Sequence, residues 1–179
     1  LDKTLASLSG FYYTDAEETS SYQKADLPEQ TDLSLLDYAD TATDCTMEKG
    51  SEGITVSNLG ADPNVVFPGV ASCFADNDKL YGLSLTVDAP DETEMAVYYQ
   101  TEGDEGFSAE KVYTFKVTED NRTWEHLVPG GITELRVDVS SPVESAVINN
   151  FELKSCDITE SGYTALKESG VDEVTFSDS

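Results

Sequence analysis

Between residues 45 and 156, apolar side chains alternate with polar ones, and this period of two constrains the fold more than any other feature of the chain. Turn residues such as Asp-Pro, Pro-Gly and Gly-Gly separate the alternating segments. Closely spaced strands with no helical segment between them predict an antiparallel sandwich or barrel, with one face of each strand buried. The clearest segments are Tyr81–Val87, Glu94–Tyr99, Lys111–Val117, Leu135–Val139 and Val147–Leu153, and further candidates are Ile54–Val56, Val65–Phe67 and Thr123–Val128.

The charge of the chain excludes several classes of function. Its 179 residues include 36 Asp plus Glu against 10 Lys plus Arg, a formal net charge of −26. Nucleic acids and anionic lipid surfaces repel so acidic a protein, so we expect neither as a partner. A single histidine excludes metal sites built from several histidines. No apolar run approaches the roughly 20 residues that a membrane-spanning helix needs.

The distribution of residues along the chain predicts three segments. Residues 1–44 are rich in Asp, Glu, Ser and Thr and are expected to form an N-terminal strap or linker, partly packed by its aromatic side chains. Residues 45–156 carry the strands. Residues 157–179 are expected to form a short helix over 162–170, with Gly170 as its C-cap, followed by a strand beginning at Val174. Since that strand is cut short, we expect the parent polypeptide to continue.

Four motifs, in this order, carry a resemblance to a known class of domain. They are Ile54-Thr-Val-Ser-Asn-Leu-Gly-Ala-Asp-Pro-Asn-Val-Val-Phe-Pro68, Val97-Tyr-Tyr-Gln-Thr-Glu-Gly-Asp-Glu-Gly-Phe-Ser-Ala-Glu110, Ile132-Thr-Glu-Leu-Arg-Val-Asp138 and Ile148-Asn-Asn-Phe-Glu-Leu153. The set resembles the jelly-roll domains, similar to carbohydrate-binding modules, that extracytoplasmic parts of bacterial surface proteins carry. Some of those are large membrane proteins linked to envelope glycans. The chain departs from the pattern at Leu135-Arg-Val-Asp-Val139, where a related sequence reads Leu-Arg-x-Asp-Pro.

The resemblance implies a fold class and a location. The fold class is all-β, an antiparallel jelly-roll β-sandwich with short helical or irregular terminal segments, and the location is extracellular or at the cell surface. A non-catalytic domain that binds cell-surface carbohydrate is the leading hypothesis. The alternative is a structural spacer or protein-interaction module of a larger membrane protein. A glycoside-active enzyme ranks last, because the sequence holds no nucleophile elbow, phosphate loop or metalloprotease histidine pair.

Carbohydrate binding requires aromatic platforms for sugar rings and a few polar groups for hydroxyls. Tyr98 alternates with Val97 and Tyr99 and is therefore expected to reach the solvent face of its strand. The loop after it holds Phe107, and Trp124 follows Arg122 in a predicted strand. These four residues are the candidate ligand-binding set, although Trp124 equally suits packing at a sheet edge. His126 is expected to be a half-exposed sheet residue.

Calcium is the natural ion for an acidic secreted sandwich, because carboxylate oxygens are plentiful. The candidate ligands are Asp76, Asn77 and Asp78, which lack the glycine and distal glutamate of a calcium loop. A solvated surface loop explains the same residues.

Three cysteines cannot all pair within one chain. In a jelly roll the first and last strands are usually neighbours, which predicts a Cys45–Cys156 disulfide under oxidising conditions and leaves Cys73 as a buried free thiol. A Cys45–Cys73 disulfide and three reduced thiols are the alternatives.

Overall fold

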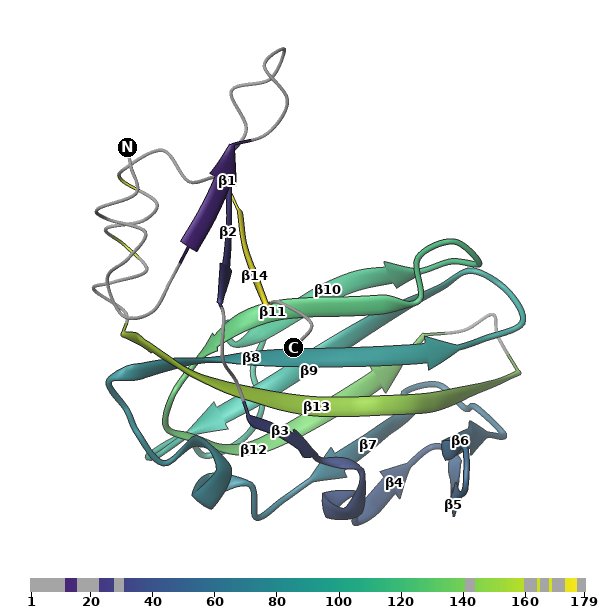
Figure 1. The fold of residues 1–179 in the computed structure, drawn as a ribbon. Coiled ribbons are helices and arrows are strands. Elements are labelled where there is room, and N and C mark those ends of the chain that lie inside the picture. The colour runs from purple at the N-terminus through teal and green to yellow at the C-terminus, as the bar shows by residue number, and fades with distance from the viewer. Residues whose placement is uncertain are drawn as a thin grey trace.

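The chain folds into two antiparallel sheets that pack face to face (Figure 1). The computed structural model describes residues 12–15, 23–27, 31–140, 144–159, 164, 168 and 173–176. Successive strands alternate between the two sheets along much of the chain, which is the connectivity of a jelly roll. The predicted all-β jelly-roll sandwich is therefore confirmed.

The first sheet has five strands in the order β10-β9-β12-β7-β4. Their bounds are Val112–Val117, Thr93–Thr101, Ile132–Val139, Asn64–Phe67 and Thr41–Thr43. In β9, Met95 and Val97 are buried while Glu94 is exposed and Tyr98 half-exposed, so the alternation read from the sequence gives the inner and outer faces correctly. The sheet's outer face carries the candidate site described below.

The second sheet has six strands. Its main path runs β11-β8-β13-β6-β5, and β3 pairs with β13 beyond the end of β6. The bounds are Thr123–Pro129, Lys79–Asp88, Ser145–Thr159, Gly53–Ser57, Thr46–Gly50 and, for β3, Thr31–Ser34. Short 3-10 helices at η2 (Leu36–Tyr38) and η3 (Ala71–Phe74) join strands of the two sheets.

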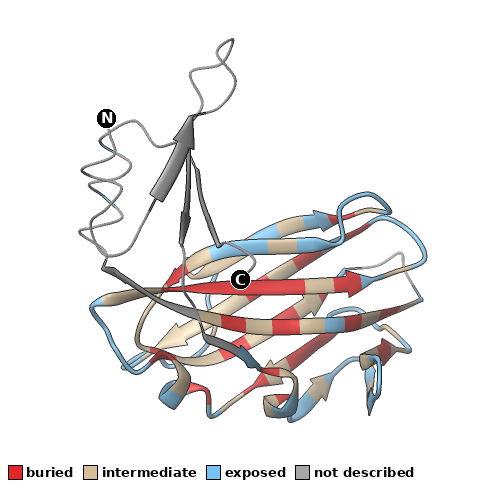
Figure 2. Cartoon of the chain, in the orientation of Figure 1, coloured by how far each residue is buried: buried red, intermediate tan, exposed pale blue. Residues whose placement is uncertain are grey.

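The core lies between the sheets, where Figure 2 shows buried positions alternating with less buried ones along β13 and a nearly continuous buried run along β8. Phe67 of β7 and Phe151 of β13 meet edge to face, with ring centroids 4.9 Å apart, and both are fully buried. This pair joins the two sheets near their centre strands, and its burial removes some of the largest apolar surfaces from water.

The sandwich takes in strands from the segment that we expected to be a strap. β3 pairs with β13, and β4 pairs with β7 at the edge of the five-stranded sheet. Both strands are short, and their sequences, Thr-Asp-Leu-Ser and Thr-Ala-Thr, are mostly polar. They therefore show no apolar alternation from which a strand could be predicted. Within the described residues, the two sheets of the sandwich therefore begin at Thr31 and not at Cys45.

A small separate sheet has the order β1-β2-β14, with bounds Tyr12–Asp15, Gln23–Leu27 and Glu173–Phe176. The predicted strand at Val174 is thus present, and it pairs with β2 in parallel. Most of the predicted helix over 162–170, including Gly170, lies outside the described residues. Thr164 and Glu168, the two positions of that range that are described, are helical.

The predicted Cys45–Cys156 disulfide is wrong. Cys45 is a free thiol whose Sγ donates to the Asn64 carbonyl oxygen at 3.5 Å, and burial raises its pKa. Thr46, the residue after Cys45, pairs with Ser57 of β6. Ser57 also pairs with Ser145, the first residue of β13, so Cys45 lies near the beginning of that strand. Cys156 follows Ser155 near the other end of that long strand, a separation on the order of 30 Å at about 3.3 Å per residue.

The physical reason is the strand order. The neighbour of β13 at the level of Cys156 is β3, where Lys154 pairs with Asp32, and not the strand that follows Cys45. Cys73 is free, as expected, but it is half-buried, and its Sγ donates to the Tyr38 hydroxyl at 3.4 Å.

Candidate functional site

A hollow of ≈ 500 Å³ lies on the outer face of β10, β9 and β12. Its floor is Ala96, which pairs with Thr114 on one side and with Asp138 on the other. Because Ala96 is small, the larger side chains around it form walls and leave space above it. Along β9 these walls are Glu94 and Tyr98, two residues either way from Ala96. We call this feature the sheet-face hollow.

Tyr98 forms one end of the sheet-face hollow. Arg136 of β12 is its cross-strand partner and does not itself line the hollow. The Arg136 guanidinium carbon lies 4.2 Å from the centroid of the Tyr98 ring. Phe107, from the loop between β9 and β10, lies against the same guanidinium at 5.2 Å. Cation–π attraction of this kind favours the packing of both rings on the guanidinium. Two of the four predicted ligand-binding residues, Tyr98 and Phe107, are thus brought together.

Arg136 is held in turn by Asp138, two residues further along β12. The Nε atom donates to Oδ1 at 2.7 Å and Nη2 donates to Oδ2 at 2.8 Å, so the ion pair is bidentate. Both side chains are largely buried, with exposed fractions of 21% and 16%. Burial raises the pKa of Asp138 above its usual value, and the Arg136 guanidinium opposes that rise.

The other end of the sheet-face hollow is formed by Glu94 and Lys116, which pair across β9 and β10. The ammonium group of Lys116 contacts a carboxylate oxygen of Glu92 at 3.1 Å, and this bond raises the pKa of Lys116. Lys116, which lines the hollow, and Arg136, which packs on Tyr98, therefore each have a carboxylate partner, and Glu94 adds a further negative charge. Among the described residues that line the hollow, no basic side chain lacks a carboxylate partner.

Trp124 does not reach the sheet-face hollow. β10 and β11 are edge strands, each at one end of its sheet. The aromatic rings on their inner faces contact one another where the two sheet edges face each other. Trp124 lies nearly parallel to Phe115, with centroids 5.1 Å apart, and 5.5 Å from Tyr113. Tyr113, whose pKa is raised by burial, also contacts His126 at 4.7 Å. Trp124 is therefore a packing residue at the sheet edge, and His126 is exposed on its strand.

The remaining predicted site residues lie elsewhere. Arg122 donates to a carboxylate oxygen of Asp88 at 2.6 Å, and both side chains are exposed. Asp76 uses Oδ1 to accept from the backbone N–H of Asp78 at 2.9 Å, which closes a turn. Among the described residues, no three acidic, histidine or cysteine side chains come together in a way that could hold a metal ion. Calcium binding by Asp76, Asn77 and Asp78 stays a prediction.

The sequence did not single out Arg136 and Asp138, nor Ala96, Glu94 and Lys116, which also form the site. The spacing of two between Arg136 and Asp138 on a strand places both on one face, and that face is polar, so the signal was present in the motif Leu135-Arg-Val-Asp-Val139. The motif alone does not predict the strand register, in which Arg136 pairs with Tyr98.

No protein-family model matches the sequence, and no curated protein matches it significantly. Solved structures do match. The chain is similar to CBM86, a low-affinity xylan-binding module from Roseburia intestinalis, with 10% identity, a TM-score of 0.50, and coverage of 72% of this chain and 96% of the module. It also matches CBM29_1, a family 29 carbohydrate-binding module from Piromyces equi, at 10% identity and a TM-score of 0.46, covering 70% of this chain and 90% of that one.

A third match is the C-terminal CBM6 of a laminarinase from Zobellia galactanivorans, with 14% identity, a TM-score of 0.44, and coverage of 71% of this chain and 100% of that one. The match to CBM86, at a TM-score of 0.50, shows that the chain shares the fold of that carbohydrate-binding module. At 10% identity, the likeness to CBM86 concerns the fold and not the ligand. None of the described helices is long and apolar enough to cross a membrane.

Proposed function

We propose that this chain is a non-catalytic domain that binds neutral carbohydrate in the sheet-face hollow. The observation that carries the proposal is the end wall of the hollow, where Tyr98 lies beside the Arg136–Asp138 ion pair. An aromatic ring offers a surface for the C–H face of a sugar, and an adjacent charged pair offers donors and acceptors for its hydroxyls. The volume of ≈ 500 Å³ lies within the range of ligand sites.

The charges support a neutral ligand. Lys116 and Arg136 are each paired with a carboxylate, and Glu94 adds a negative charge to the lining of the hollow. The net charge of −26 adds a long-range repulsion toward sulfated or uronic acid polysaccharides. Binding of a neutral glycan involves no counterion release and is expected to depend little on salt.

The proposal that the domain is non-catalytic rests on the state of Asp138. A glycosidase needs one protonated carboxyl free to donate to the leaving oxygen and a second carboxylate opposite it. Both oxygens of Asp138 accept from Arg136, so this carboxyl is not free to donate. No sugar should be released when the protein is incubated with the polysaccharides that it binds.

We also propose an extracellular or cell-surface location, as part of a larger bacterial surface protein. The support is the order of sequence motifs that resembles domains of such proteins. Cell fractionation of the source organism, followed by detection with an antibody to this domain, tests it. Recovery of the protein in the cytoplasm alone would refute this location.

The binding proposal is tested by affinity electrophoresis against neutral polysaccharides (arabinoxylan, mixed-linkage β-glucan and galactomannan) and anionic ones (alginate and polygalacturonate). We expect retardation by at least one neutral polysaccharide and by neither anionic one. The Tyr98→Ala variant should lose about tenfold or more in affinity, which corresponds to about 1.4 kcal/mol. Arg122→Ala, on an exposed residue away from the hollow, is the matched control and should bind like the wild type. Retardation by the anionic polysaccharides alone would overturn the proposal.

A further inference from the structure

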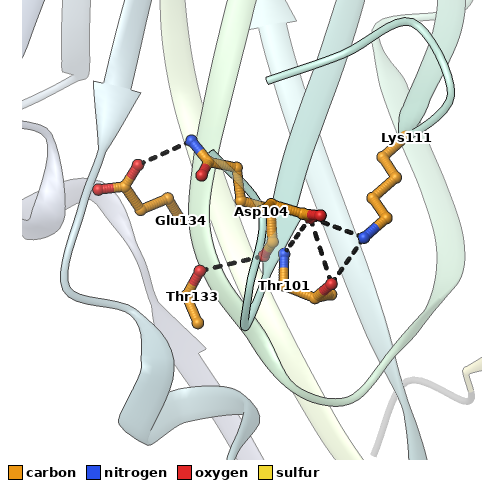
Figure 3. A network of polar contacts seen from close by, with 6 residues as sticks. Thr101, Asp104, Lys111, Thr133 and Glu134 are labelled. Atoms are coloured by element: carbon orange, nitrogen blue, oxygen red, sulfur yellow. Dashed lines mark hydrogen bonds and ion pairs between the residues drawn. The ribbon is translucent and has the colours of Figure 1, made fainter. Parts of the chain in front are cut away.

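The loop between β9 and β10 is closed at its base by a compact polar network (Figure 3). Oδ2 of Asp104 accepts from the Thr101 backbone N–H at 2.8 Å, from the Thr101 hydroxyl at 3.2 Å and from Lys111 Nζ at 2.6 Å. Lys111 Nζ also donates to the Thr101 hydroxyl at 2.6 Å. One carboxylate oxygen thus links the end of β9 to the residue that precedes β10.

Phe107 lies within the segment that this network closes. It follows Asp104 by three residues and precedes Lys111 by four. Its ring contacts Arg136, whose guanidinium also packs on Tyr98 at the end of the sheet-face hollow. Gly103, at φ +92°, and Gly106 flank the approach to Phe107, and a Cβ atom at either would touch nothing within 4 Å. Because glycine allows a wide range of backbone angles, the loop would adopt many conformations without the network.

A second set of bonds fixes the strand ends to which the loop is attached. Gln100 Nε2 donates to Glu134 Oε2 at 3.0 Å, and the Thr133 hydroxyl donates to the Gln100 carbonyl oxygen at 3.3 Å. Thr133 lies where the β12–β9 register shifts between Ile132 and Glu134. These bonds join the end of β9 to β12, the strand that carries Arg136. The base of the loop and Arg136, which Phe107 contacts, are therefore held in position relative to each other.

We propose that Asp104 and Lys111 are positioning residues for the carbohydrate site. Their ion pair holds Phe107 against Arg136, the guanidinium that also packs on Tyr98 at the end of the sheet-face hollow. Asp104, Lys111 and Phe107 all lie outside the lining of the hollow, so Asp104 and Lys111 act on it through the contacts of Phe107 with Arg136 and of Arg136 with Tyr98. This inference rests on the proposed function for its effect on affinity, but its structural part can be tested without any ligand.

The ligand-free test is the Arg136 Nε–H resonance in ¹H–¹⁵N spectra of the whole chain. This group lies close to the Tyr98 and Phe107 rings, so its chemical shift reports on both. Phe107→Ala should move the resonance, and Lys111→Met and Asp104→Asn should each move it in the same direction. Asp88→Asn removes another exposed ion pair and should leave it in place. An unchanged Arg136 resonance in both Lys111→Met and Asp104→Asn would overturn the inference.

The ligand test is a double-mutant cycle, with affinity measured for whichever neutral polysaccharide retards the wild type most. Lys111→Met is expected to weaken binding by about threefold to tenfold, and Phe107→Ala by at least as much. Adding Lys111→Met to Phe107→Ala should weaken it no further, because both changes remove one contact. Additive losses would show that Lys111 acts independently of Phe107 and would refute the positioning role. If no neutral polysaccharide binds the wild type, the proposed function fails, while the Arg136 resonance still decides the positioning role.

Discussion

Arg136 and Asp138, two residues apart on one strand, meet in a bidentate ion pair on the outer face of the five-stranded sheet, at 2.7 and 2.8 Å. A strand places residues at this spacing on the same face, and the flat guanidinium matches the geometry of a carboxylate. The pair fixes the guanidinium against Tyr98, so one short segment of β12 both stabilises the sheet and forms a wall of the hollow.

Arg136→Met should destabilise the fold, because it leaves the Asp138 carboxylate largely buried without its partner. We expect a loss of about 1–3 kcal/mol at pH 7, measured by urea unfolding. The double variant Arg136→Met/Asp138→Val leaves no unpaired charge and should lose less. Equal stability of Arg136→Met and wild type would contradict a structural role for the pair.

The same variant should raise the pKa of Asp138 further, because the guanidinium that opposes the effect of burial is gone. An acid whose folded pKa lies above its unfolded value stabilises the fold below the unfolded pKa, near 3.9, and loses that contribution as the pH rises through the folded pKa. The destabilisation by Arg136→Met should therefore be larger at pH 7 than at pH 4. A ¹³C titration of the Asp138 carboxyl checks the direction directly.

The pKa of Asp104 is shifted in the opposite direction from that of Asp138. The hydrogen bond from Lys111 holds the pKa of Asp104 below its usual value. Its contribution to the stability of the loop is present above the unfolded pKa, near 3.9, and is lost as the pH falls through the lower folded pKa. In Lys111→Met the midpoint of the Asp104 carboxyl titration should move upward. A midpoint that stays low would mean that Lys111 is not the main partner.

Gly53 and Gly50 are the two ends of the β5–β6 hairpin turn and form a matched pair. Gly53 has φ +124°, and a Cβ atom there would lie 2.0 Å from the Ile148 carbonyl oxygen of β13. Gly50 has nothing within 4 Å of the same position. Gly53→Ala should therefore cost about 2 kcal/mol or more, and Gly50→Ala less than about 1 kcal/mol, in thermal or urea unfolding. Similar losses would mean that Gly53 does not approach β13.

The alternation of apolar residues predicted most of the sandwich, because a strand with one buried face records that face in its own sequence. It also placed Tyr98 correctly on the outer face, since Val97 and Tyr99 point inward. It could not place Trp124 in the same way. Trp124 and His126 share the inner face of an edge strand, where the opening between the sheets leaves them partly exposed.

Pairing between distant strands was beyond the sequence. Alternation fixes the face of a residue but not its partner, so the Tyr98–Arg136 register could not be derived from either strand alone. The same limit produced the wrong disulfide, because β3 takes the place beside β13 that we assigned to the strand after Cys45. β3 itself is too short and too polar to be detected by periodicity.

The central claim is that neutral carbohydrate binds in the sheet-face hollow, and a map of amide chemical shifts during titration with neutral oligosaccharides tests it most directly. Arabinoxylan and mixed-linkage β-glucan oligosaccharides are suitable probes. We predict saturable shifts at Ala96, Tyr98 and Arg136, and none at Trp124 or His126. Shifts confined to Trp124 and His126, or no shifts with any neutral oligosaccharide at millimolar concentration, would contradict the claim.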